Sequence, residues 1–170
     1  MAAQFNRSAV RCDAGTGPET AGSRRGRGMS LVCIRSTEHA AHALEQVDDA
    51  LVHEGFSSRD RFAVRLALEE ALVNGLKHGN GNDPGKEVRC WWTVSPSGFK
   101  AVVEDEGPGF DRRRVPDCRA DENLARPSGR GLLLMRSAMT WVRLNRRGNR
   151  VTLYKRRTTD DRSEGAQGTP

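Results

Sequence analysis

The sequence predicts an α/β two-layer sandwich, with helices on one face of a mixed, mostly antiparallel sheet. Two observations predict this class. The apolar patterns follow the order strand, helix, helix, strand, strand, helix, strand, strand. The last two strands are joined by a turn short enough for a hairpin. The length of 170 residues suits one such domain with a core of its own.

The first predicted strand is a short apolar run at residues 30–35. Ser36 or Thr37 then caps a helix that runs to about His53, and Gly55 is suited to end it. Apolar residues recur on this helix at helical spacing, which predicts that one side is buried. These residues are Ala40, Leu44, Val47 and Leu51.

A second helix is predicted over residues 57–79, because Ser57 and Asp60 have the spacing of a capping box with Asp in place of Glu. The Asn-, Gly- and Pro-containing segment 80–85 is a loop. Two strands follow across a Ser-Pro-Ser-Gly turn, at residues 87–94 and 99–104.

Residues 111–128 are charged, contain two prolines and predict a loop. A third helix opens at Leu132, and residues 141–145 and 151–155 form the closing hairpin. The domain therefore spans residues 30–157. The basic N-terminal extension at residues 1–29 and the C-terminal tail at residues 158–170 lack apolar periodicity and are expected to be disordered.

The formal net charge is +6, but much of the basic excess lies near the two ends of the chain. Aromatic residues make up only 5%, too few for an obvious base-stacking platform, so we expect no nucleic-acid partner. No apolar run approaches the roughly 20 residues of a membrane span. The first residues also lack the apolar block of a secretory signal, and we expect a cytoplasmic protein without a membrane partner.

The second helix carries a polar stripe formed by Glu70, Asn74, Lys77 and His78, which share one sector at α-helical spacing. The stripe is interleaved with small residues, which favours a pocket wall. An Asn oxygen suits Mg²⁺, which also takes phosphate oxygens and water. A carboxylate one turn away is placed to orient or deprotonate a hydroxyl or water. The structural alternative is an i,i+4 polar contact on a solvated face.

Two glycine-containing segments provide the remaining candidate ligand-binding residues. Asp105 directly follows an apolar strand, and its carboxylate can accept a hydrogen bond from an exocyclic amine such as that of adenine. Gly107 and Gly109 would let the backbone approach a flat ring closely. Gly129, Arg130 and Gly131 precede the third helix, where exposed N–H groups form an anion site. That segment can also be a flexible helix start without a ligand.

In this order, the three segments resemble the N, G1 and G2 boxes of the GHKL (Bergerat-fold, histidine kinase-like) ATPase superfamily. The resemblance covers roughly residues 31–156, and the three motifs together are far more specific than any one. The resemblance implies ATP and Mg²⁺ as cofactors, with Glu70 as the catalytic base and Asn74 as the metal ligand. The implied ATP-binding residues are Asn74, His78, Asp105, Gly107, Gly109, Gly129, Arg130 and Gly131.

The single-domain pattern resembles the anti-sigma-factor serine/threonine kinases. That resemblance implies phosphorylation of an antagonist protein, capture of a sigma factor and control of transcription by partner switching. It also makes a homodimer an expected state. Residues 111–128 would be the ATP lid, although residues 123–127 depart from the Thr-Thr-Lys run that some of these kinases carry. The alternative function is a non-catalytic ATP-binding regulator that captures a protein partner.

Overall fold

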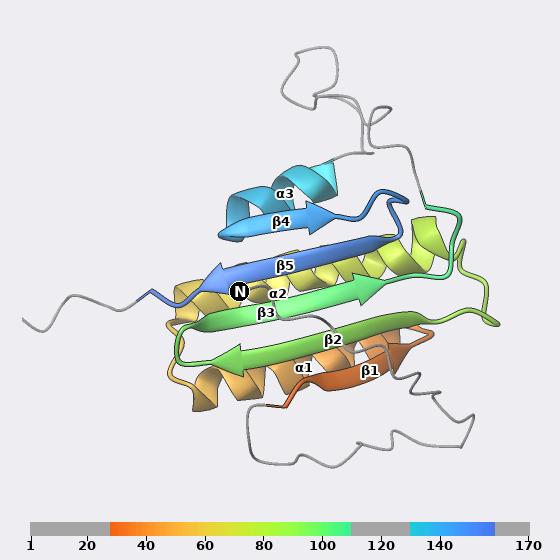
Figure 1. The fold of residues 1–170 in the computed structure, drawn as a ribbon. Helices are drawn as coiled ribbons and strands as arrows, with labels where there is room; N and C mark the ends of the chain where they lie inside the picture. The colour runs from red at the N-terminus through yellow and green to blue at the C-terminus, as the bar shows by residue number, and fades with distance from the viewer. Residues whose placement is uncertain (1–27, 110–129, 159–170) are drawn as a thin grey trace, which may run out of the picture.

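The computed structural model describes residues 28–109 and 130–158. Five strands form one open sheet in the order β1-β2-β3-β5-β4, and every neighbouring pair is antiparallel (Figure 1). The predicted α/β two-layer sandwich is confirmed. The strands are β1 (Ser30–Ile34), β2 (Val88–Ser95), β3 (Gly98–Glu104), β4 (Trp141–Leu144) and β5 (Arg150–Arg156).

The helices lie together on one face of this sheet (Figure 1). They are α1 (Thr37–His53), α2 (Ser58–Asn74) and α3 (Arg130–Ala138), and α2 contacts both of the others. The short π-helical element η1 (Gly75–Gly79) continues α2. No helix within residues 28–109 and 130–158 has the length and apolar character that crossing a bilayer requires.

Local sequence explains where the first two helices begin. The Ser36 hydroxyl accepts the His39 N–H at 3.2 Å and caps α1, while the Ser57 hydroxyl accepts the Asp60 N–H at 3.2 Å and caps α2. The connection between the helices turns at Gly55, whose φ of 72° is a conformation that glycine adopts without strain. All four predicted stripe residues of α1 are buried.

The core lies between α2 and the inward-facing residues of β3 and β5. Val64, Leu68 and Leu72 of α2 are fully buried, as are Phe99 of β3 and Leu153 of β5. Burying each large apolar side chain contributes about 2 kcal/mol. This packing fixes α2 relative to the end of β3, and so positions the polar residues that each element carries.

The structure differs from the sequence prediction at the end of the second helix. The α-helix ends at Asn74, and the next five residues form a π turn closed by the Asn80 N–H, which donates to the Gly75 carbonyl at 2.8 Å. A π turn rotates less per residue than an α turn. The directions that α-helical spacing assigned to Lys77 and His78 therefore do not hold, and both side chains are exposed.

Two further features differ from the prediction. The third helix begins at Arg130, two residues before the predicted Leu132. The sheet, predicted to be mixed, has only antiparallel pairs among the described residues. The predicted lid at residues 111–128, Gly129 and most of both predicted tails lie outside the described residues.

Candidate functional site

Asp105 follows the last residue of β3 and lies in a cradle made by two glycines. Its Oδ1 accepts the Gly107 N–H at 2.9 Å. A Cβ on Gly79 would overlap the Asp105 carboxyl group, and a Cβ on Gly107 would overlap the Gly79 carbonyl. Glycine is therefore required at both positions by close approach. The end of η1, the Asp105 side chain and the loop after β3 form one tightly packed unit.

The pKa of Asp105 is raised above its ordinary value of 3.8, and burial is the largest cause. The hydrogen bond from Gly107 and the positive charge of Arg147 act in the opposite direction, while Glu104 adds to the rise. The result is a partly desolvated carboxyl group at the end of the central strand β3. Such a group is well placed to accept a hydrogen bond from a ligand, because a bond in a desolvated site is stronger than in water.

The backbone of this loop is held by residues from two other segments. The Asp105 N–H donates to the Asn149 carbonyl at 3.0 Å, and Asn149 Nδ2 donates to the Asp105 carbonyl at 3.0 Å. From the other side, Asn80 Oδ1 accepts the Glu106 N–H at 2.9 Å. Both asparagines are buried, with 7% and 3% of their surface exposed. Neither residue was predicted from the sequence, because each lies in a segment whose composition indicates only a turn.

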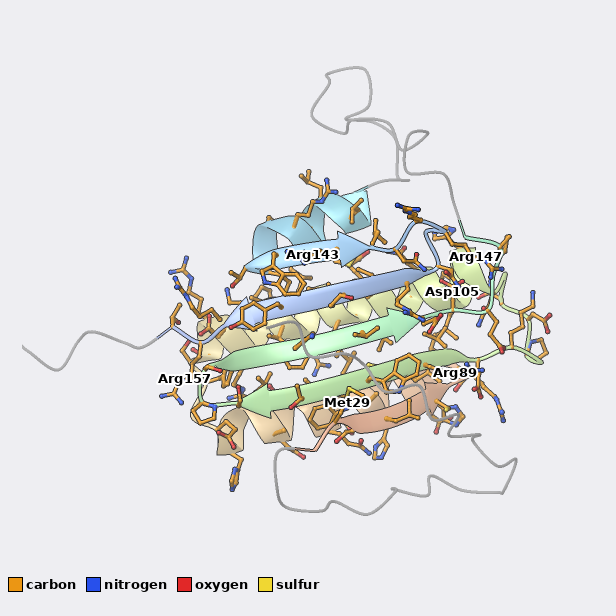
Figure 2. The ribbon with its side chains drawn as sticks, in the orientation of Figure 1. Met29, Arg89, Asp105, Arg143, Arg147 and Arg157 are labelled. Carbon is orange, nitrogen blue, oxygen red and sulfur yellow. The ribbon has the colours of Figure 1, made fainter. Side chains whose placement is uncertain are left out.

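Arg147 continues this support along the loop. Its Nη2 donates to the Gly107 carbonyl at 3.1 Å, and its Nε donates to the Pro108 carbonyl at 3.3 Å. A Cβ on Gly109, whose φ is 79°, would overlap the Arg147 carbonyl. Asp105 and Arg147 lie at the same end of the sheet (Figure 2). The turn between β4 and β5 is thus part of the site, a relationship that no local sequence pattern indicated.

Glu70 and Asn74 meet the start of α3. They lie one turn apart on α2, and both side chains are half-buried. A Cβ on Gly131 would lie 2.6 Å from Glu70 Oε2 and 3.0 Å from Asn74 Nδ2. The predicted N-box pair and one predicted G2 glycine therefore come together in space, at the end of a helix whose first N–H groups have no partner within the helix.

The element η1 joins the two parts of the site. Asn74 immediately precedes this element. Gly79 is its last residue and packs closely against the Asp105 carboxyl group. A Cβ on Gly75 would lie 2.9 Å from Val88 Cγ2 and 3.7 Å from Asp105 Cβ, so the first residue of η1 also packs closely. Gly131 and the loop after β3 thus lie near opposite ends of one short segment.

Not every predicted residue is placed in this way. His78 lies on η1 with an exposed side chain. Gly129 and the side chain of Arg130 fall outside the described residues, so their predicted contacts with phosphate stay predictions.

The donor set fits a magnesium nucleotide better than a free metal ion. The polar side chains beside Gly131 are one carboxylate and one amide, from Glu70 and Asn74. Within the part of the chain that the structure describes, no three His, Cys, Asp or Glu residues gather to hold a metal. Magnesium commonly takes one or two protein oxygens and completes its shell with phosphate and water. The two residues suit that arrangement.

The family model of the histidine kinase-like ATPase domain matches residues 33–155, well over half of the sequence. The matched range runs from the end of β1 into β5 and contains Glu70, Asn74, Asp105 and Gly131.

Proposed function

The chain belongs to the histidine kinase-like ATPase family, and from this premise we propose that it is an ATP-dependent protein serine/threonine kinase and anti-sigma factor. The family is one of ATPase domains, so ATP is the nucleotide that the site is suited to bind. One observation carries the proposal of catalysis. Glu70 and Asn74 both lie against Gly131, which puts a carboxylate and a side-chain amide at the N-terminal end of a helix.

The adenine would bind at Asp105. The carboxylate would accept a hydrogen bond from the exocyclic amine. Gly79 and Gly107 have no side chains to occupy the space beside it. Asn74 would supply a protein oxygen to magnesium, which when bound neutralises phosphate charge. The first N–H groups of α3 have no partner within the helix and would donate to phosphate oxygens.

Phosphate transfer would use Glu70 as the base. The oxygen of a serine or threonine hydroxyl on the protein substrate forms a bond to the γ-phosphorus of ATP. The bond from that phosphorus to the β–γ bridging oxygen breaks, and ADP leaves with the electron pair. Glu70 accepts the hydroxyl proton, as a positioned carboxylate can do in general base catalysis.

The proposed partners are an antagonist protein, which is the phosphate acceptor, and a sigma factor, which the chain holds inactive. The support is the resemblance of the single-domain motif pattern to the anti-sigma-factor kinases. Phosphorylation of the antagonist would decide which of the two complexes forms. A regulator of sigma factors acts where transcription takes place, so the proposal includes a cytoplasmic location. The same resemblance to the anti-sigma-factor kinases supports a homodimer as the working state.

The test is phosphate transfer from γ-labelled ATP to purified candidate antagonists, alongside calorimetric ATP binding. The wild type is expected to bind ATP and label one serine or threonine. Glu70→Gln keeps the size and polarity of the side chain but removes the base, so it should bind ATP and fail to transfer. If the wild type binds ATP and captures partners but never labels them, the chain is instead a non-catalytic regulator.

A further inference from the structure

We propose that Asn149, in the turn between β4 and β5, is a positioning residue that sets the selectivity of the site for adenine by fixing Asp105. The inference rests on the proposed ATP site and deepens it. Asn149 lies 44 residues from Asp105 in the sequence, and it would act on the nucleotide only through that residue.

Asn149 holds both backbone polar groups of Asp105. Its carbonyl accepts the Asp105 N–H, and its Nδ2 donates to the Asp105 carbonyl, each at 3.0 Å. The strand pairing of β3 with β5 ends one step earlier, at Glu104 and Arg150. The side chain of Asn149 therefore replaces the next backbone donor at the point where Asp105 leaves the sheet.

A second asparagine fixes the orientation of the Asn149 amide. Asn145 Nδ2 donates to Asn149 Oδ1 at 2.8 Å, which leaves Asn149 Nδ2 directed at Asp105. Asn145 is itself fixed, because its Oδ1 accepts the Gly148 N–H at 2.8 Å and the Arg150 N–H at 3.2 Å. The chain of bonds runs without a break from the turn to Asp105.

Because the Asp105 backbone is fixed, the position of its carboxylate is also restricted. With its backbone held by Asn149 and its Oδ1 bonded to the Gly107 N–H, Oδ2 is the oxygen to which we assign the ligand amine. Hydrogen bonds weaken steeply with distance and angle. A small shift of the Asp105 backbone would weaken the bond to an amine, and would also relax the rejection of a base that presents a carbonyl in its place.

ITP provides the matching probe, because it carries an oxygen where ATP carries the exocyclic amine. The ratio of ITP to ATP dissociation constants reports the alignment of Asp105. Phosphate, ribose and magnesium contacts cancel in that ratio. A residue that only stabilises the hairpin would change both constants or the unfolding free energy, and would leave the ratio unchanged.

The experiment measures both dissociation constants by calorimetry on the full chain. Asn149→Asp is nearly isosteric and keeps an acceptor for Asn145, but it replaces the donor to the Asp105 carbonyl with an acceptor. The selectivity for ATP is expected to fall roughly tenfold, the loss of one good hydrogen bond. Asn149→Ala, which removes the donor without adding charge, should lower it in the same direction.

Thr140→Ala is the matched control. Thr140 Oγ1 accepts the Arg156 N–H at 2.9 Å, so the substitution removes a side chain–backbone bond from the same hairpin at its other end. It should lower stability and leave the ratio unchanged. In an Asp105→Ala background, which has no polar side chain to contact the base, either Asn149 substitution should have no further effect on the ratio, because its route to the nucleotide is gone.

The outcomes separate the two proposals. Selective ATP binding by the wild type together with unchanged selectivity in both folded Asn149 variants would overturn the positioning role and leave the ATP site standing. A further loss of selectivity caused by the Asn149 substitutions in the Asp105→Ala background also overturns it. A folded wild type that binds neither nucleotide overturns the proposed function, and the inference with it.

Discussion

Gly131 lies so close to Glu70 that a single methyl group would come within 2.6 Å of the carboxylate oxygen Oε2. This closeness joins the start of α3 to the residue proposed as the base. A substitution here can therefore change catalysis and stability by different amounts, although the two usually change together in a packed protein. The atom in the way is the end of a flexible side chain, which can move aside without disturbing the core.

Gly131→Ala is therefore expected to damage catalysis more than stability. The methyl group displaces the Glu70 carboxylate, and a misplacement of about 1 Å can lower the rate of phosphate transfer by about a hundredfold. The free energy of unfolding should change by less than about 1 kcal/mol, because alanine favours the helix. Transfer assays and urea unfolding measure the two quantities. Ser137→Ala, an exposed position on the same helix, is the control and should leave both unchanged. Normal transfer by Gly131→Ala would argue against Glu70 as the base.

Adenine selectivity should depend on pH through Asp105. Its pKa is raised above 3.8, chiefly by burial, and the ionised form accepts from the amine. Selectivity for ATP over ITP is therefore expected to be full well above that pKa and to be lost as the pH falls through it, at a higher pH than for an ordinary aspartate. Calorimetry of both nucleotides across the acidic range measures this. Asp105→Asn removes the titrating group and corrects for titration of the bases; an equal pH dependence in that variant would contradict the assignment.

Asp60 should be a major contributor to stability, far from the site. It is 1% exposed, and its Oδ2 accepts both the Thr158 N–H at 2.8 Å and the Thr158 hydroxyl at 2.7 Å. Lys155 Nζ lies 3.4 Å from Oδ1, an ion pair longer than a close hydrogen bond. Asp60→Ala leaves the largely buried ammonium group of Lys155 without its carboxylate partner and should cost about 3 kcal/mol in urea unfolding. Asp48→Ala, which breaks the more exposed pair with Arg61, should cost about 1 kcal/mol or less.

The same carboxylate predicts how stability varies with pH. Burial raises the pKa of Asp60, but the two bonds from Thr158 and the charge of Lys155 outweigh burial and hold it below 3.8. The stabilisation is therefore fully present above 3.8 and is lost as the pH falls through the lower folded-state pKa. Thermal unfolding of wild type and Asp60→Asn between neutral and acidic pH measures this. Curves that stay parallel over the whole range would show that Asp60 does not contribute in this way.

Cys90 should be chemically inert in the folded protein. It is fully buried in β2, and desolvation raises the pKa of its thiol to about 12. Since the thiolate is the reactive form, iodoacetamide at mildly alkaline pH should leave Cys90 unmodified in native protein and modify it in denaturant. Peptide mass mapping distinguishes it from the other cysteines. Rapid native labelling would mean that the sheet opens locally at β2.

The sequence predicted the part of the site that depends on short-range geometry. Glu70 and Asn74 share a face because an α-helix fixes the direction of residues four apart. Asp105 could be placed at a strand end because an apolar run stops directly before it. His78 shows the limit of the same rule, because the helix changes to a π turn after Asn74, and the constant angle per residue no longer holds.

The supports of Asp105 could not be predicted, because they depend on pairing between distant segments. Asn149 reaches Asp105 only because β5 pairs with β3 in one register, with Glu104 opposite Arg150. A shift of one residue would direct Asn149 to the other side of the sheet. Hydrophobic periodicity indicates that a strand exists, but not which partner it takes.

The dependence of Asp105 on a late hairpin has a consequence during protein synthesis. The chain emerges from the ribosome from its N-terminus, so α2 and β3 are made well before the turn at residues 145–150. Until that turn follows, the backbone of Asp105 has no partner in Asn149. In a nascent or prematurely terminated chain, the contact that we propose for adenine thus lacks its backbone support, which is complete only when the hairpin has formed.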